Sequence, residues 1–353
     1  MTMTRFPLYF LLLAVILATG CVHPDKPLPP PPAETRSITT IVKNNYAFSL
    51  FYQALQRTGL DRVLDTAAGP FTLLAADNDG FMLAGITADS LAKMDTATLG
   101  PWIRYHIIPQ YIPTASIPQA VDFTYTSLAG KPLYFSVPLP VPGQHQNPTA
   151  ANPMVHINGV GTTQVDIFAA NGVIYDMTKP LTYPSYATVK DFLEHTPRYS
   201  NLTQALRQFG LLDELAQPGP FVLLAPDNDV FAAHGIDSAA LSTMDSTHYR
   251  GMLFTTDILT PNFFFVTDLS DAPAPIGPFV NLPLLPTPDG MLEIGASGIV
   301  LMPFDYLALE QAGLNPYIYG ETADITDPDH LTGNGLVQGV NALIVLPDNV
   351  TKQ

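Results

Sequence analysis

The sequence has a single cysteine, Cys21, among its 353 residues. An intrachain disulfide and a zinc–thiolate cluster are therefore excluded. Charged residues are scarce as well, at 13% of the chain, and the basic ones are the scarcer, because 15 Lys and Arg face 31 Asp and Glu. The resulting net charge of −16, without any basic stripe, repels nucleic-acid phosphates. We therefore expect no nucleic acid among the partners.

The sequence patterns of common catalytic and metal sites are also missing. The eight histidines form no HxH or HExxH pair, no serine lies in G-x-S-x-G, and no Walker or dinucleotide glycine pattern occurs. We therefore expect no catalytic residue, no cofactor and no metal site. The sequence favours a non-enzymatic protein, with a hydrolase whose site lacks a recognisable motif as an open alternative.

One apolar run stands out, at the N-terminus. Arg5 is followed by the apolar stretch 6–17 and then by the small residues 18–20 before Cys21. This order resembles the signal peptide of bacterial lipoproteins, in which the cysteine is lipidated and becomes the mature N-terminus. We predict a signal peptide over 1–20 and lipidation of Cys21. An ordinary cleaved signal peptide with an incidental cysteine is the alternative.

Proline is abundant, with 35 residues, and "VHPDKPLPPPPAE" follows the cysteine. Such a stretch cannot form a core, and polyproline II segments act as semi-rigid spacers. We therefore predict that residues 21–38 form the lipidated cysteine and a tether. Because Val22 rather than an aspartate follows Cys21, the resemblance to lipoproteins implies the outer membrane of a Gram-negative bacterium. We expect a surface-exposed protein, with the periplasmic face as the alternative.

The remainder of the chain contains an internal repeat. "FTLLAADNDGF" at 71–81 returns as "FVLLAPDNDVF" at 221–231, and the similarity continues on both sides of these segments. Self-similarity over this length predicts two homologous domains. We place them at 39–185 and 186–349.

Each predicted domain mixes helices and strands. "YAFSLFYQALQRTGL" (46–60) has apolar residues at helical spacing and ends at a glycine. The short apolar runs that follow Gly-Pro in both copies are typical of buried strands. We predict an α+β fold with a small sheet system and helices packed on one side.

Several segments, in order and spacing, resemble the fasciclin domain of the fasciclin-1 superfamily: "TLLAADNDGF", "YHIIP", "VHINGV" and "DIFAANGVIYDMTKPL". The resemblance implies a sandwich- or wedge-like sheet system and a role in adhesion or binding. The second copy departs from the pattern, because Thr255 and Thr256 stand where the first has Tyr105 and His106. It also carries an insertion-like stretch at about 302–333.

Two acids and an amide recur in both copies, and they raise the question of calcium. The residues are Asp77, Asn78 and Asp79, and Asp227, Asn228 and Asp229. An EF-hand loop needs an oxygen ligand at its fifth position, where these segments have Phe81 and Phe231. We predict helix capping instead, because Asp and Asn satisfy the free backbone donors of a first turn. A weak surface calcium site is the alternative.

Two tyrosine-containing segments are candidates for a binding surface. In animal matrix relatives of the fasciclin family the region of Tyr105 and His106 is implicated in adhesion, although packing inside the domain is the competing interpretation. Tyr317 and Tyr319 lie in the insertion-like stretch, and exposed tyrosines stack on sugars or fill partner pockets.

The sequence as a whole predicts a lipid-anchored envelope protein that mediates adhesion or binds a protein or glycan partner through tandem fasciclin-like domains. Its partners are then the membrane, through the anchor, and an unidentified molecule at the cell envelope. The alternative is an accessory subunit of an outer-membrane nutrient (glycan) uptake complex.

Overall fold

The computed structural model describes residues 34–66, 69–137, 155–249, 252–255, 258–259, 264–268, 285–287, 290–295, 298–302, 321 and 323–352. The predicted signal peptide, Cys21, Tyr317 and Tyr319 lie outside the described residues. Arg36–Gln353 groups as one compact unit of the chain. Within the described part, no helix has the length and apolar character to span a membrane. We call residues 36–185 the first half and residues 186–352 the second half.

The first half contains a seven-stranded sheet in the order β2-β1-β7-β6-β5-β4-β3. Its strands are β1 (Phe71–Ala76), β2 (Ile107–Ile108), β3 (Phe123–Thr126), β4 (Pro132–Ser136), β5 (His156–Ile157), β6 (Val160–Ala169) and β7 (Gly172–Met177). β1 runs parallel to β7, and the other pairs are antiparallel. The helices are α2 (Ile38–Asn44), α3 (Ser49–Thr58), α4 (Leu60–Thr66), α5 (Asn78–Leu83), α6 (Ala88–Lys93) and α7 (Thr96–Tyr105), with short 3₁₀ turns η1 (Tyr46–Phe48) and η2 (Thr114–Ser116).

The second half repeats the centre of this sheet as β13-β14-β8-β9. The four strands are β8 (Phe221–Pro226), β9 (Ile258–Leu259), β13 (Ile325–Leu331) and β14 (Gly335–Val340), and β8 is parallel to β14. A separate three-stranded sheet joins β10 (Leu285–Thr287), β11 (Gly290–Gly295) and β12 (Gly298–Met302). The helices are α8 (Val189–His195), α9 (Ser200–Gln208), α10 (Asn228–Ala233), α11 (Ser238–Ser242) and α12 (Met252–Thr255), with η3 (Pro197–Tyr199), η4 (Glu214–Ala216) and η5 (Pro347–Asn349).

The structure changes the interpretation of the insertion-like stretch 302–333. Residues 325–331 of this stretch form β13, which pairs with β14 as β6 pairs with β7 in the first half. This part therefore belongs to the repeated sheet and is not inserted. Residues 303–320 lie outside the described residues.

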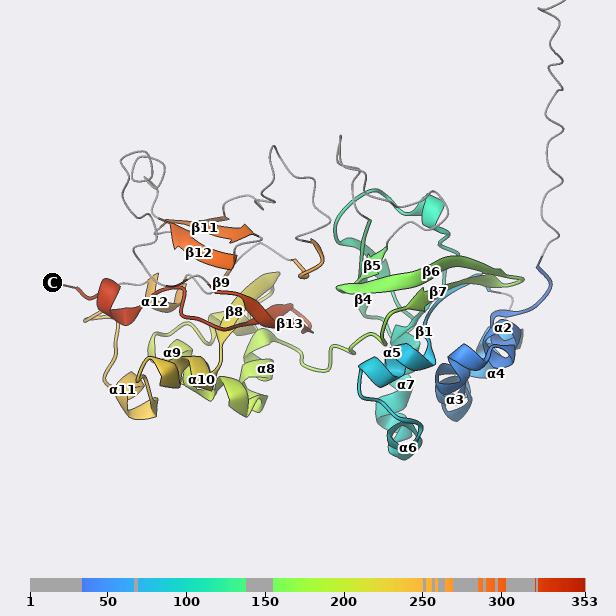
Figure 1. The fold of residues 1–353 in the computed structure, drawn as a ribbon, viewed down its shortest axis with the longest axis horizontal. Helices are drawn as coiled ribbons and strands as arrows, with labels where there is room; N and C mark the ends of the chain where they lie inside the picture. Colours follow the sequence, from blue (N-terminus) through green and yellow to red (C-terminus); the bar gives the residue numbers. More distant parts are fainter. Residues whose placement is uncertain are drawn as a thin grey trace, which may run out of the picture. The chain divides into compact units, whose positions relative to one another are not determined.

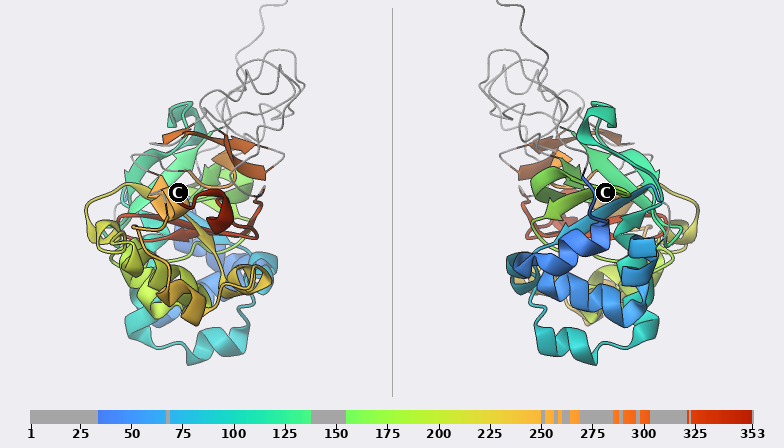
Figure 2. Two further views of the ribbon diagram at one scale, coloured as in Figure 1. Left: turned by 90° about the vertical axis from the view of Figure 1, so that its left-hand side faces the viewer. Right: turned by 90° about the vertical axis from the view of Figure 1, so that its right-hand side faces the viewer.

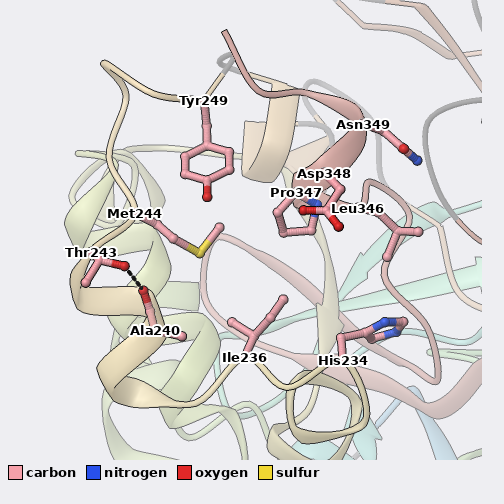
Figure 3. A pocket seen from close by; sticks show the side chains of 10 residues that line it. All are labelled: His234, Ile236, Ala240, Thr243, Met244, Tyr249, Leu346, Pro347, Asp348 and Asn349. Carbon is pink, nitrogen blue, oxygen red and sulfur yellow. Dashed lines mark hydrogen bonds between the residues drawn. The ribbon is translucent and has the colours of Figure 1, made fainter.

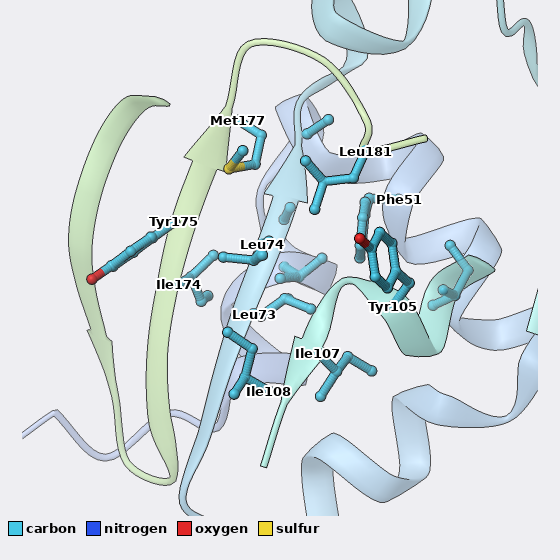
Figure 4. Close-up of a cluster of buried hydrophobic side chains, with 14 of the residues drawn as sticks. Phe51, Leu73, Leu74, Tyr105, Ile107, Ile108, Ile174, Tyr175, Met177 and Leu181 are labelled. Carbon is cyan, nitrogen blue, oxygen red and sulfur yellow. The ribbon is translucent and has the colours of Figure 1, made fainter. Parts of the chain in front are cut away.

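In each half the helices gather on one side of the sheet, which confirms the predicted α+β fold (Figures 1 and 2). One cluster of buried side chains lies within residues 38–181 and a second within 189–350, close to the predicted boundaries. All six residues of β1 are buried, since helices cover one face and the curled sheet the other. Figure 4 shows this centre of the first half, where β1 and β7 meet α3 and α7.

In each half, an asparagine next to the parallel strands forms hydrogen bonds to neighbouring helices. The side-chain amide of Asn171 donates to the carbonyl oxygen of Leu64 (2.6 Å) and accepts from the backbone N–H of Ile38 (2.9 Å). Asn334 accepts in the same way from the N–H of Val189 (2.8 Å). These hydrogen bonds satisfy backbone groups at the end of one helix and at the start of another, which have no partner within their own helix. Both copies of the repeat have kept the asparagine in this role.

The glycine that follows each asparagine permits the parallel strands to approach closely. A Cβ atom on Gly172 would lie 2.0 Å from the carbonyl oxygen of Phe71, and one on Gly335 would lie 2.5 Å from that of Phe221. Both distances are below contact, and both neighbours are backbone atoms that cannot rotate away. The requirement for glycine is therefore steric.

We expect Gly172→Ala to destabilise the first half by more than about 3 kcal/mol, because β1 and β7 must separate to admit the methyl group. Gly100→Ala in α7 is the matched control, since a Cβ there meets no atom within 4 Å. That change should be neutral or stabilise by about 0.5–1 kcal/mol through helix propensity. Urea unfolding measures both, and similar losses in the two variants would contradict the steric explanation.

Candidate functional site

The first acid of the repeated Asp-Asn-Asp segment is a helix N-cap in both halves. Asp77 precedes α5, and its Oδ1 accepts from the N–H of Gly80 at 2.8 Å. Asp227 precedes α10, and its Oδ1 accepts from the N–H of Val230 at 3.1 Å. Each carboxylate therefore satisfies a first-turn donor that has no intrahelical partner.

The asparagine of the segment ties its helix to the one before it. The Asn78 side chain accepts from the N–H of Leu50 (3.1 Å) and donates to the carbonyl oxygen of Tyr46 (2.9 Å). Asn228 makes the same pair of contacts, donating to the carbonyl oxygen of Pro197 at 2.9 Å. This amide clamp fixes the start of α3 or α9 against α5 or α10.

The third residue of the segment, Asp79 or Asp229, lies in the first helical turn, where a negative charge interacts favourably with the helix dipole. Among the described residues, no three His, Cys, Asp or Glu side chains come together in a way that could hold a metal ion. The hydrogen bonds of the segment therefore give it a structural role, in which it caps one helix and joins it to another.

We expect Asn78→Ala to lower the stability of the first half by about 1–3 kcal/mol, because the partly buried N–H of Leu50 loses its acceptor and the exposed carbonyl oxygen of Tyr46 loses its donor. The loss should be the same with calcium or with a chelator. Asn228→Ala is the matched variant in the second half, and Asp79→Ala should cost less than about 1 kcal/mol. Scanning calorimetry with and without calcium measures this. A calcium-dependent rise in Tm that disappears in Asp79→Ala would restore the calcium hypothesis.

Tyr105 and His106 do not form a surface. Both side chains are 0% exposed, at the end of α7, so neither can contact a partner in this conformation. The Tyr105 hydroxyl donates to the carbonyl oxygen of Pro132 (2.9 Å) and accepts from the Asn158 amide (2.6 Å). The hypothesis of a binding surface here is not supported, because burial assigns this hydroxyl to the junction between α7 and the sheet.

His106 is held as a neutral ring. Its Nε2 accepts from the N–H of Leu181 at 2.8 Å, so the remaining proton lies on Nδ1, which donates to the carbonyl oxygen of Trp102 at 2.9 Å. Phe51 and Trp102 contact the ring edge-to-face, each with a centroid separation of 5.6 Å. Burial lowers the pKa of His106 to about 4.

The depressed pKa of His106 makes the first half sensitive to acid. The folded state binds this proton less readily than the unfolded state, so stability is full above about pH 6.5 and falls as the pH drops towards 4. The whole shift corresponds to about 3 kcal/mol. Trp102 is the only tryptophan in the chain and reports unfolding by its fluorescence.

We expect His106→Gln to be less stable at neutral pH and to lose the part of the acid destabilisation that lies between about pH 6.5 and 4. Replacement of an exposed histidine, His248→Gln, should leave that part unchanged. Denaturant titrations followed by Trp102 fluorescence across this range compare the three proteins. An identical acid limb in all of them would assign it to other groups.

Sequence reasoning missed an exposed apolar surface beside the amide clamp. Tyr46 is 86% exposed, Met82 64% and Leu83 75%. Tyr46 and Met82 line one open cavity of about 410 Å³, together with Asp77, Asn78, Asp79 and Ala47. We call Tyr46, Met82 and Leu83 the apolar patch. The signal in the sequence was the repeat itself, which has alanine at the positions of Met82 and Leu83.

A second open cavity, also about 410 Å³, lies in the second half (Figure 3). Ile236, Met244 and Leu346 supply apolar lining, and Tyr249 and His234 lie at its edge. His234 contacts the Glu321 carboxylate through Nε2 at 3.1 Å. In the repeat alignment Tyr249 takes the place of Leu99, which is fully buried in α7.

Comparisons with known proteins agree with the fold of the first half. A family model for the fasciclin domain matches residues 46–184, so this segment is similar to fasciclin domains. Protein sll1483 of Synechocystis sp. is 29% identical over 157 residues, which are 43% of this chain and 78% of that relative. A solved FAS1 domain pair from the insect cell adhesion molecule fasciclin I is similar over 87% of this chain and 99% of its own, with 17% identity and a TM-score of 0.37. A second fasciclin-like domain and the lipid anchor stay predictions.

Proposed function

We propose that this protein is a non-enzymatic binding protein of the cell envelope, lipid-anchored through Cys21, which holds a protein partner at the apolar patch of its first half. The single observation that carries the proposal is the exposure of Tyr46, Met82 and Leu83 on one side of a well-packed domain. The fasciclin match supports the class, since domains of this family occur in adhesion proteins. Their fold alone does not decide the partner.

The patch has the character of a protein contact. Tyr46 begins η1, whereas Met82 and Leu83 end α5, so the amide clamp of Asn78 holds the two apolar elements together. Tyrosine and methionine are enriched at the centres of interfaces, tyrosine because its rigid ring loses little conformational freedom and methionine because its flexible side chain adapts to a partner. The exposed Asp79 beside them favours a partner with a basic group at the edge of its apolar surface.

The second half gives an internal comparison for the patch. η3 begins with Pro197 where η1 begins with Tyr46, and α10 ends with Ala232 and Ala233 where α5 has Met82 and Leu83. The capping residues and the clamp are retained in both halves, but the large apolar side chains are present in one. The patch is therefore not required by the fold, which supports a binding role for it.

The N-terminal sequence supports tethered display. A lipid on Cys21 and the proline-rich residues 22–34 would hold the folded part away from the membrane, on a spacer of about 3 Å per residue in polyproline II. A weak contact gains from this arrangement, because tethering confines the module and its partner to one surface and raises their effective concentration.

A photo-crosslinking amino acid in place of Leu83, in intact cells, tests the proposal. We expect a discrete protein adduct whose yield falls at least about tenfold on Tyr46→Ser together with Met82→Ser, since central aromatic contacts dominate binding. Folding should be unaffected, because surface changes cost within about 0.5 kcal/mol. The same crosslinker in place of Phe168, which is 51% exposed on β6, is the control.

The outcome also separates adhesion from an accessory role. Mixed cultures that carry the crosslinker on one strain and a labelled proteome on another distinguish an adduct from a neighbouring cell from one within the same envelope. The first supports adhesion, and the second supports an accessory subunit of an envelope complex. Equal adducts from positions 83 and 168, or an adduct that survives the double substitution, would contradict binding at the apolar patch.

A further inference from the structure

The two halves of the chain contact each other through buried groups. The ring of Tyr134, on β4, packs against Phe265 of the second half, with 5.8 Å between the centroids. Beside this pair, the Ser136 hydroxyl donates to the Asp268 carboxylate at 2.6 Å. Ser136 and Asp268 are each 2% exposed, so the hydrogen bond lies away from solvent. This contact joins residues that are more than one hundred positions apart.

Two carboxyl groups meet in this contact. The Ser136 hydroxyl accepts from the backbone N–H of Asp122 (3.0 Å), and the other oxygen of Asp268 accepts from the N–H of Phe265 (2.7 Å). Asp122 and Asp268 therefore meet at the Ser136 hydroxyl, and their carboxyl groups interact strongly enough for the charge of Asp268 to add to the burial that raises the pKa of Asp122. Two carboxyl groups can hydrogen-bond to each other only while one of them keeps its proton.

The surroundings of the pair are acidic. The charge of Asp329, from β13, raises the pKa of Asp122 further, and the charge of Asp122 adds to the burial that raises the pKa of Tyr134. Asp329 itself accepts from the N–H of Val266 at 3.0 Å, and Lys179 and His330 lie near it. No cation is among the groups that act on Asp122 in the described structure.

We propose that the contact between the two halves is a proton-dependent latch, which closes when the Asp122–Asp268 pair holds a proton and loosens when both carboxyl groups ionise. A proton between the carboxyl groups supplies a hydrogen bond across the contact. Its loss leaves two negative charges facing each other in a poorly solvated place, with Asp329 nearby, and repulsion then opposes closure.

The direction of the pH dependence follows from the pKa of the pair. Burial, and then the charge of Asp268, raise the pKa of Asp122 to about 8. A carboxyl group whose pKa is raised in the closed form contributes fully below its ordinary pKa of about 4. Its contribution is lost as the pH rises through the raised value. The ratio of closed to open forms should therefore fall by up to roughly tenfold for each pH unit in this window.

A distance measurement on the full chain tests the latch. Spin labels on Ala92→Cys in α6 and Ala239→Cys in α11, in a Cys21→Ser background, report the separation of the halves by double electron–electron resonance. Both sites are exposed, and they lie on the corresponding helices of the two halves. We expect one narrow distance distribution at about pH 5 and a broad one at about pH 9, on either side of the raised pKa.

Asp122→Asn should keep the narrow distribution at every pH, because the amide preserves the hydrogen bond and cannot ionise. Asparagine also tolerates the left-handed backbone of this position, where φ is +57°. Asp166→Asn is the matched control, since φ there is +55° and its partner is Thr114 rather than the second half. The distance distribution of that variant should broaden as the pH rises, as it does in the unmodified chain.

Asp268→Asn repeats the test from the other half, in case Asp122→Asn alters folding as judged by circular dichroism. The latch is supported if both amide variants, or the one that folds, lose the pH dependence. It is overturned if the unmodified chain shows one distribution across the whole range, or if the transition persists in the amide variants.

Discussion

The parallel pairing of β1 with β7, and of β8 with β14, is the constraint on which each half depends. In the first half this pairing joins Phe71–Ala76 to Gly172–Met177, which are about a hundred residues apart in the sequence. Most of the first half therefore belongs to the long loop that the pairing closes. A glycine at the start of the second strand lets the backbones meet, and the preceding asparagine fastens two helices to the same corner. The second half reproduces both devices with Gly335 and Asn334.

Comparison of the two copies of the repeat separates the residues that the fold requires from the residues that are found in one half alone. The N-capping aspartates and the amide clamps of Asn78 and Asn228 are retained with the same partners in both halves. Tyr105 and His106 are not retained, although both are buried in the first half. Burial therefore explains how these two side chains stabilise the first half. It does not explain how the second half folds without them. The apolar patch differs in another way, since its side chains contribute little to any core.

The sequence predicted the α+β fold, the repeat and the capping role of its acids because each leaves a local pattern. It could not place Tyr105 and His106, since an aromatic at helical spacing looks the same whether it faces the core or solvent. The apolar patch escaped for a related reason, because hydrophobicity alone does not tell whether Met82 and Leu83 are buried or exposed. Asp122 and Asp268 had no local signal at all. Their meeting depends on how the two halves dock, which periodicity does not encode.

Two titrating sites act on this protein in opposite directions. His106 is neutral in its core, so acid destabilises the first half as the pH falls from about 6.5 to 4. The Asp122–Asp268 pair keeps a proton, so a rise in pH weakens the contact between the halves. Because the neutral His106 ring and its hydrogen bonds to Leu181 and Trp102 are unaffected by alkaline conditions, the latch can open while the core of the first half stays intact. The contact between the halves is thus separable from the folding of each half.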